Sequence, residues 1–261
     1  MEIGFVQFSP RFGEKEKNIK KVMELIGEDR ADLIVLPELF TTGYLFLDKV
    51  ETGKYAESVS NSHTIDVFHN LSKEKNAVIV GGFAEKDGEK IYNSQFVIYE
   101  EKVAIYRKAH LFYKEKFLFD KSNSKYVIFD TGGAKLGLMI CFDWMFPEMM
   151  RTLALHGADI ICHSANLVMP YCQKAMITRA LENRVYIITA NRTGMDKRGE
   201  YEVRFTGKSQ IVSPDGNIIL SADETDEIFK KIDIDEALAR DKRINEMNDL
   251  FSDRRTDLYK L

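Results

Sequence analysis

The sequence predicts a single α/β domain, in which helices cover sheets that contain both parallel and antiparallel strands. Short apolar runs recur along its 261 residues, and such runs are typical of strands that are buried on both faces. Between several of them, apolar residues recur at the spacing of about 3.6 residues that gives a helix one apolar face. Strands and helices that alternate in this way form β-α-β units, whereas adjacent strands with short turns indicate antiparallel pairs.

The chain opens with a β-α-β unit. Four consecutive apolar residues over 33–36 are closed by Pro37, as expected of a strand buried on both faces. In order, we expect a strand over 3–8, a helix over 19–26, a strand over 32–38, an irregular stretch over 39–60, a helix over 65–71 and a strand over 77–80.

The rest of the chain repeats this alternation after one antiparallel pair, which we expect over 91–99 and 103–107. Pro147 opens a helix and Gly157 ends it, directly after a strand and the segment Cys-Phe-Asp-Trp over 141–144. The remaining expected elements are strands over 136–140, 160–162 and 186–189, a helix over 177–184, and a hairpin of 209–212 with 218–220.

The composition argues against several classes of protein. Lys and Arg number 37 and Asp and Glu number 41, so the net charge of -4 disfavours an electrostatic nucleic-acid binder. No apolar run reaches the ~20 residues of a membrane-spanning helix, and the first residues lack the features of a secretory signal. We therefore expect a cytoplasmic protein that binds neither nucleic acid nor a membrane.

The cysteines and histidines suggest neither disulfides nor a metal site. Cys141, Cys162 and Cys172 are odd in number and contain no Cys-x-x-Cys, which favours a reducing compartment. The five histidines form no ligand cluster, and the glycine pairs lack the context of a phosphate loop. We expect no metal and no cofactor.

Three reactive residues follow the carboxyl ends of predicted strands, namely Glu38, Lys108 and Cys141. Each alone has an ordinary alternative: a salt-bridged Glu, a solvated Lys and a buried structural Cys. Ligands of open α/β sheets bind beyond the carboxyl ends of strands. Because all three residues lie there, their shared placement favours a common active site. A thiol nucleophile, a carboxylate base and an ammonium for the oxyanion suit acyl transfer. We also expect the helix after Cys141, with any nearby ammonium, to favour the thiolate.

Three motifs contain these residues: Leu-Pro-Glu-Leu-Phe over 36–40, Tyr-Arg-Lys-Ala-His-Leu-Phe over 106–112, and Gly-Leu-Met-Ile-Cys-Phe-Asp over 137–143, with Phe-Pro-Glu behind it over 146–148. In this order they resemble the nitrilase superfamily of carbon-nitrogen hydrolases. The resemblance extends through 165–168 and 179–184 to 253–255 and is greatest to short, single-domain nitrilases and amidases of thermophilic microbes.

The resemblance implies a four-layer αββα sandwich with Glu38, Lys108 and Cys141 as catalytic residues. It also implies a catalytic role for Glu115, which the sequence alone would equally explain as a surface ion pair with its flanking lysines. Phe142 is expected to contribute through its backbone N–H. Family position marks Tyr44, Tyr113, Trp144 and Tyr171 as candidate substrate-binding residues, and Asn166 is a fifth candidate because it ends another apolar strand. Residue type alone would make the aromatic side chains core residues and the asparagine a turn cap.

We therefore expect a hydrolase of nonpeptide C–N bonds in small molecules, of the amidase type, that acts through a thioester on Cys141. Aliphatic nitrilase is a near-equal alternative, because the motifs serve amides and nitriles alike. An N-carbamoyl amine hydrolase, a Cys-His peptidase with His110 as its base, and a non-catalytic scaffold are less favoured.

The C-terminal segment is polar, with isolated apolar anchors at Leu250, Phe251, Leu258 and Tyr259. Such a segment packs back on its own domain or crosses a second surface. The resemblance favours the second option, because family members generally pair through their helical layers. We expect one domain over 1–261, with 241–261 as a tail at the interface of a homodimer or a higher even oligomer.

Overall fold

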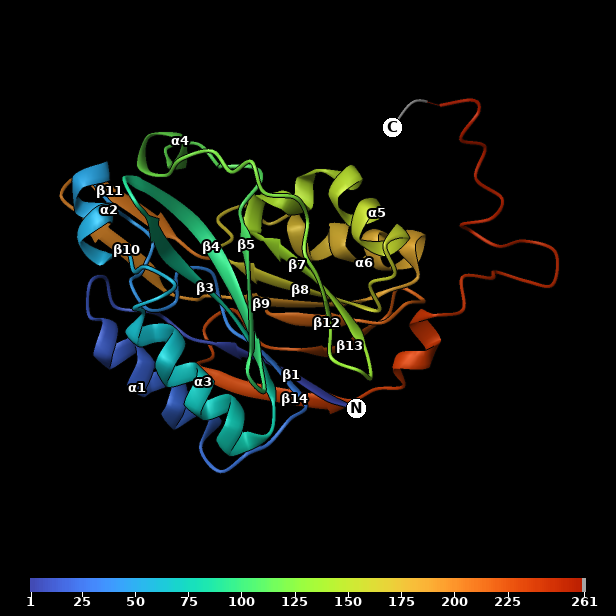
Figure 1. The fold of residues 1–261 in the computed structure, drawn as a ribbon, viewed down its shortest axis with the longest axis horizontal. Coiled ribbons are helices and arrows are strands. Elements are labelled where there is room, and N and C mark those ends of the chain that lie inside the picture. Colours follow the sequence, from blue (N-terminus) through green and yellow to red (C-terminus); the bar gives the residue numbers. More distant parts are fainter. Residues whose placement is uncertain (260–261) are drawn as a thin grey trace.

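The protein has four layers, in the order helix, sheet, sheet, helix (Figure 1). The computed structural model describes residues 1–259. Two six-stranded sheets lie face to face, and a separate two-stranded hairpin lies at one end of them. The predicted α/β class and αββα sandwich are confirmed.

The first sheet has the strand order β14-β1-β2-β3-β4-β5, so the first and the last strand of the chain lie side by side. Strands β1, β2 and β3 are parallel, and the other pairs are antiparallel. The bounds are β1 (Glu2–Gln7), β2 (Leu33–Val35), β3 (Val78–Asp87), β4 (Lys90–Tyr99), β5 (Lys102–Arg107) and β14 (Ile228–Asp233). The predicted β-α-β opening and the antiparallel pair β4–β5 are confirmed.

The second sheet has the order β13-β12-β9-β8-β7-β6, with β7, β8 and β9 parallel. The bounds are β6 (Ile128–Asp130), β7 (Lys135–Ile140), β8 (Ile160–Ala165), β9 (Tyr186–Asn191), β12 (Gln210–Val212) and β13 (Ile218–Ser221). The predicted hairpin is the antiparallel pair β12–β13.

Helices cover the outer face of each sheet, α1 (Lys15–Ile26) and α3 (His63–Lys75) on the first, α5 (Pro147–Leu155) and α6 (Cys172–Asn183) on the second. Successive side chains of β2 point to opposite faces of the sheet and therefore contribute to two different hydrophobic cores. Leu33 and Val35 belong to the core shared with the second sheet, whereas Ile34 lies in the core under α1 and α3. No helix within residues 1–259 is long and apolar enough to cross a membrane.

The stretch 39–60, predicted to be irregular, contains a helix, α2 (Lys49–Tyr55), so that prediction is wrong. This helix buries only Thr52 and therefore has no apolar stripe to reveal it. Its signal is the N-cap, where Asp48 accepts a hydrogen bond from Glu51 N at 2.8 Å. Other elements that the patterns did not predict are β6, β14, α4 (Glu115–Leu118), the hairpin β10 (Met195–Arg198) with β11 (Tyr201–Arg204), and the 3-10 helices η1 (Cys141–Met145) and η2 (Glu236–Ala239).

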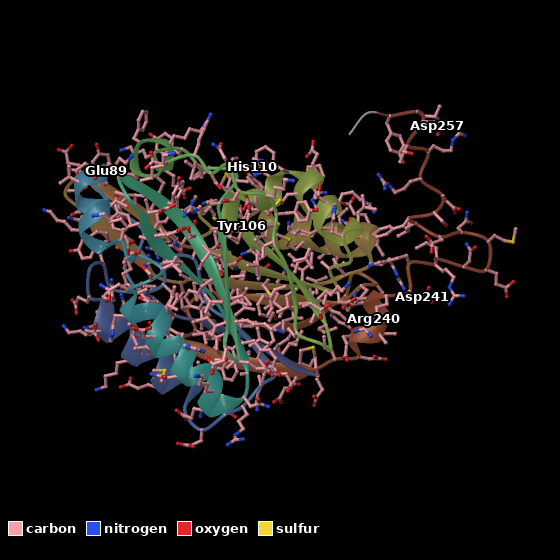
Figure 2. All side chains as sticks on the ribbon, viewed as in Figure 1. Glu89, Tyr106, His110, Arg240, Asp241 and Asp257 are labelled. Atoms are coloured by element: carbon pink, nitrogen blue, oxygen red, sulfur yellow. The ribbon has the colours of Figure 1, made fainter. Side chains whose placement is uncertain are left out.

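The C-terminal tail extends away from the sandwich from Asp241 onward, and its side chains project on both sides of the extended chain (Figures 1 and 2). Two side chains of the tail contact the domain: Lys242 Nζ donates to the Arg184 and Asn183 carbonyl oxygens at 2.7 and 3.1 Å, and the Phe251 ring centre lies 5.3 Å from the Arg151 guanidinium. Leu258 and Tyr259 remain 69% and 42% exposed. Positions 260–261 of the predicted tail lie outside the described residues.

Candidate active site

The three residues that follow strand ends in the sequence meet at one end of the sandwich. Glu38 lies just beyond β2, Lys108 directly follows β5, and Cys141 directly follows β7. Gly82 on β3 allows the Glu38 backbone to come close, because a Cβ atom at Gly82 would lie 2.6 Å from the Glu38 Cα. The site therefore draws residues from both sheets, Glu38 and Lys108 from the first and Cys141 from the second.

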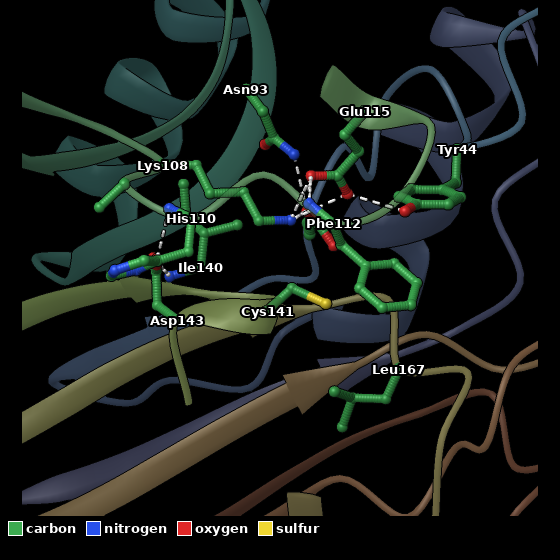
Figure 3. A network of polar contacts seen from close by, with 12 residues as sticks. Tyr44, Asn93, Lys108, His110, Phe112, Glu115, Ile140, Cys141, Asp143 and Leu167 are labelled. Carbon is green, nitrogen blue, oxygen red and sulfur yellow. Dashed lines mark hydrogen bonds and ion pairs between the residues drawn. The ribbon is translucent and has the colours of Figure 1, made fainter. Parts of the chain in front are cut away.

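A buried ammonium lies between two buried carboxylates. The Lys108 Nζ is 2.7 Å from Glu38 Oε1 and 2.8 Å from Glu115 Oε2, and none of the three side chains is more than 2% exposed. The ion pair of Glu115 is therefore with Lys108, and the surface-pair alternative is wrong. In Figure 3 the Cys141 side chain lies beside this cluster, and the charges of Glu38, Lys108 and Glu115 all act on its thiol.

Hydrogen bonds orient the two carboxylates. Asn93 Nδ2 donates to Glu38 Oε1 at 2.7 Å, and the Tyr44 hydroxyl donates to Glu115 Oε1 at 2.7 Å (Figure 3). The Phe112 backbone N–H donates to Glu115 Oε2 at 3.0 Å. The second oxygen of Glu38, Oε2, is buried and has no hydrogen-bond partner among residues 1–259. Glu38 thus keeps one carboxylate oxygen available to accept a proton.

Burial sets the protonation states of this cluster. Desolvation raises the pKa of Glu38, and the attraction of Lys108 only partly offsets it. Burial alone would lower the pKa of Lys108, but the charges of Glu115 and Glu38 outweigh it and the net pKa is raised. Lys108 is therefore a fixed cation, whereas the raised pKa of Glu38 makes it a stronger base than an exposed carboxylate and suits it to exchange protons.

The nucleophile candidate is a thiol in the resting protein. Burial raises the pKa of Cys141 well above its usual value, Glu38 raises it further, and Lys108 offsets only part of this. The expectation that the helix and an ammonium shift Cys141 toward the thiolate is therefore wrong, because burial and the nearby carboxylates outweigh the ammonium. Attack by Cys141 consequently requires a base in contact with it.

The backbone at Cys141 forms a sharp turn from β7 into η1. Its φ is +40°, in the left-handed region that residues with a Cβ rarely adopt. His163 Nε2 lies 2.9 Å from the Cys141 carbonyl oxygen, and burial lowers the pKa of His163 to about 4. A neutral His163 therefore donates from Nε2 to this carbonyl and supports the strained turn.

A cavity of about 460 Å³ opens beside the charged cluster, and its wall contains Tyr44, Phe112, Tyr113 and Glu115. A smaller recess contains Cys141 together with Phe142, Trp144 and Asn166. Phe112 and Val168 line both spaces, so the two spaces adjoin. The cavity wall is mostly apolar and is completed by residues of the β10–β11 hairpin: Tyr201, Glu202, Val203 and Arg204.

The structure brings four of the five substrate-binding candidates to these two spaces. Tyr44 and Tyr113 line the larger cavity, and Trp144 and Asn166 line the recess at Cys141. Both polar atoms of the Asn166 side chain are buried without a hydrogen-bond partner among residues 1–259, so they are available to a ligand. Tyr171 is 60% exposed immediately before α6 and lines neither of the two spaces.

Sequence reasoning did not identify three polar residues that support the site: Asn93, His163 and Asp143. Asn93 lies within the apolar-rich strand β4, and His163 lies in β8 next to a cysteine. A polar residue in a strand that is otherwise buried was the available signal, because such a residue needs a buried partner. Asp143 was quoted only as part of a motif.

Two rival functions gain no support from the site. A Cys-His peptidase needs His110 in contact with Cys141, but no hydrogen bond joins these two residues within residues 1–259, and His110 Nδ1 lies 2.8 Å from Asp143 Oδ1 (Figure 3). Across residues 1–259, no three His, Cys, Asp or Glu side chains are grouped so that they could hold a metal ion. Glu38, Lys108 and Cys141 are all present, contrary to what a scaffold that has lost its catalytic residues would show.

Comparison with known proteins identifies the family. The carbon-nitrogen hydrolase family model matches residues 2–243. A protein named nitrilase from Pyrococcus abyssi is 46% identical, with 99% of each chain covered. A 2-oxoglutaramate amidase from Bacillus subtilis is 30% identical, with 98% of each chain covered. The chain belongs to the carbon-nitrogen hydrolases of the nitrilase superfamily.

Solved structures support the same fold. A carbon-nitrogen hydrolase from Helicobacter pylori superimposes with a TM-score of 0.87 at 23% identity, covering 99% of this chain and 97% of the other. An amidase of the nitrilase superfamily from Nesterenkonia superimposes with a TM-score of 0.79 at 22% identity, covering 99% and 95%. At these identities the likeness concerns the fold.

Proposed function

We propose that this carbon-nitrogen hydrolase is an amidase that converts a small amide to a carboxylic acid and ammonia through a thioester on Cys141. The observation that supports it most is the Lys108 ammonium between Glu38 and Glu115 next to a buried thiol. A protonated thiol, an unpartnered carboxylate oxygen and a fixed cation together suit nucleophilic acyl transfer.

In the first half-reaction, Glu38 Oε2 takes the thiol proton while Cys141 Sγ attacks the amide carbonyl carbon. Lys108 and the Phe142 backbone N–H stabilise the negative charge that forms on the carbonyl oxygen. The C–N bond then breaks, the Glu38 proton passes to the leaving nitrogen, and ammonia departs. The acyl group remains on Cys141 as a thioester.

In the second half-reaction, water replaces ammonia. Glu38 removes a proton from the water as its oxygen attacks the thioester carbonyl, with Glu115 assisting through its bond to Lys108. The C–S bond breaks, the proton returns to Cys141, and the carboxylic acid is released. The same carboxylate acts as base, acid and base again, which suits a Glu whose pKa is raised by burial.

Aliphatic nitrilase is the second candidate. The relative from Pyrococcus abyssi bears the name nitrilase, and a nitrile carbon accepts the same thiol attack. The cavity of about 460 Å³ with mostly apolar walls suits a small organic substrate of either kind.

Ammonia release with a panel of small monoamides, diamides, N-carbamoyl amines, mononitriles and dinitriles decides between these functions. Turnover of amides at a higher kcat/KM than the matched nitriles supports the amidase. Preference for nitriles makes the protein a nitrilase, and no release from any compound contradicts both.

We further propose that the protein acts in the cytoplasm as a homodimer or higher even oligomer, with the tail from residue 241 at the interface. The exposed Leu258 and Tyr259 on an extended tail support it, because such side chains gain burial against a second subunit.

A further inference from the structure

One buried carboxylate connects the lysine segment to the cysteine segment. Asp143 is fully buried in η1, two residues after Cys141. Its Oδ1 accepts from the His110 backbone N–H at 3.0 Å and faces His110 Nδ1 at 2.8 Å. Its Oδ2 accepts from the Tyr106 hydroxyl at 2.8 Å and from the Ile140 backbone N–H at 3.0 Å.

The positions of these donors are informative. Tyr106 and His110 lie two residues before and two residues after Lys108, and Ile140 immediately precedes Cys141. Within residues 1–259, every hydrogen bond between the segments 106–110 and 140–146 ends on Asp143. Asp143 is thus the polar connection between a segment of the first sheet and a segment of the second (Figure 3).

Apolar contacts add to this connection but lack its directional precision. The His110 ring stacks on Phe146 with 3.6 Å between ring centres, and Phe112 lies 5.0 Å from Phe142. Stacked rings slide at little cost, whereas a buried carboxylate with four donors fixes distance and angle together.

We infer that Asp143 is a positioning residue that sets the distance between the Lys108 ammonium and the Cys141 thiol. This inference rests on the proposed roles of those two residues. The oxyanion forms on a carbon bonded to Cys141 Sγ, so the ammonium stabilises it only if both segments are held in register. A displacement of about 1 Å in such a site costs on the order of 100-fold in rate.

The test is Asp143→Asn, which keeps the size of the side chain and replaces one acceptor oxygen with a donor. If the amide oxygen takes the Oδ1 position, its NH₂ group faces the Ile140 N–H and that backbone donor loses its acceptor. We expect kcat to fall about 10- to 100-fold while KM changes less than about twofold. The matched control is Asp159→Asn, since Asp159 is also buried and accepts from the Lys135 backbone N–H at 2.9 Å, but precedes β8 and so lies at the end of the strand opposite the site.

A double-mutant cycle distinguishes positioning from a general loss of stability. In a Lys108→Met background, Asp143→Asn should lower kcat by less than about threefold, because the charge it positions is already gone. The inference is overturned if Asp143→Asn lowers kcat by the same factor in the Lys108→Met background as in the natural protein. It is also overturned if Asp143→Asn alone leaves kcat unchanged.

Alkylation of Cys141 by iodoacetamide, followed by intact mass, gives a readout that needs no substrate. Asp143→Asn should slow this reaction while Asp159→Asn leaves it unchanged, and an unchanged or faster rate in Asp143→Asn overturns the inference. Because alkylation proceeds without turnover, its outcome stands even if the panel of amides and nitriles shows no activity.

Discussion

Replacing Lys108 with Met removes one charge and leaves most of the side-chain volume in place. The Nζ atom lies 2.7 Å from Glu38 and 2.8 Å from Glu115, so the variant leaves two buried carboxylates close together without their cation. Two such groups cannot both stay ionised, and the pKa of Glu38, already raised by burial, should rise further. Proton uptake by Glu38 limits the loss of stability, which for a broken buried pair is otherwise about 3–5 kcal/mol.

The effect on catalysis is larger than the effect on binding. Lys108 acts mainly when charge develops on the substrate oxygen, and loss of one such donor costs about 100- to 1000-fold in kcat, or roughly 2.7–4 kcal/mol. The acid limb of the rate profile should also move to higher pH, because Glu38 must lose its proton to act as the base.

Steady-state ammonia release over a range of pH measures both effects. Lys116→Met is the matched control, since Lys116 is an exposed lysine in helix α4 and should keep the kcat of the natural protein. A Lys108→Met variant that raises KM but keeps kcat would show that Lys108 binds substrate and does not stabilise the oxyanion.

Three further predictions concern the two carboxylates beside Lys108 and the C-terminal tail. Glu115→Gln should preserve the fold and slow acyl transfer or deacylation, and unchanged burst and steady-state kinetics would remove Glu115 from the mechanism. Glu38→Gln should abolish turnover yet raise the melting temperature at pH 8 more than at pH 4. The folded protein holds the pKa of Glu38 above its unfolded value, so ionisation of Glu38 lowers stability as pH rises, and a fall in melting temperature at pH 8 would contradict this. Deletion from Asp249 onward removes Phe251 and should weaken the oligomer and lower activity together; sedimentation of the full-length chain as a fully active monomer at micromolar concentration would refute it.

The sequence predicted the elements with strong apolar periodicity and missed those held by polar contacts. Strand β2 and helix α1 carry repeating apolar residues that the cores confirm. Helix α2 instead depends on the Asp48 cap and buries only Thr52, so no apolar pattern marks it. The strand β14 pairs with β1 across more than two hundred residues, and no local pattern encodes such a partner.

The sequence identified those residues of the site that directly follow predicted strands. Glu38, Lys108 and Cys141 each follow a recognisable strand, and the motifs around them resemble one family. The protonation state of Cys141 was not predictable, because it depends on burial and on carboxylates brought from other segments. The role of Asp143 likewise appears only when the segments around Lys108 and Cys141 are seen together.

The most direct test of the covalent mechanism is rapid-quench intact mass with a slowly hydrolysed amide, followed by peptide mapping. We expect an acyl adduct on the peptide that contains Cys141, loss of both adduct and turnover in Cys141→Ala, and nearly unchanged turnover in Cys162→Ala and Cys172→Ala. An adduct on any other residue, or continued turnover by Cys141→Ala, would contradict it.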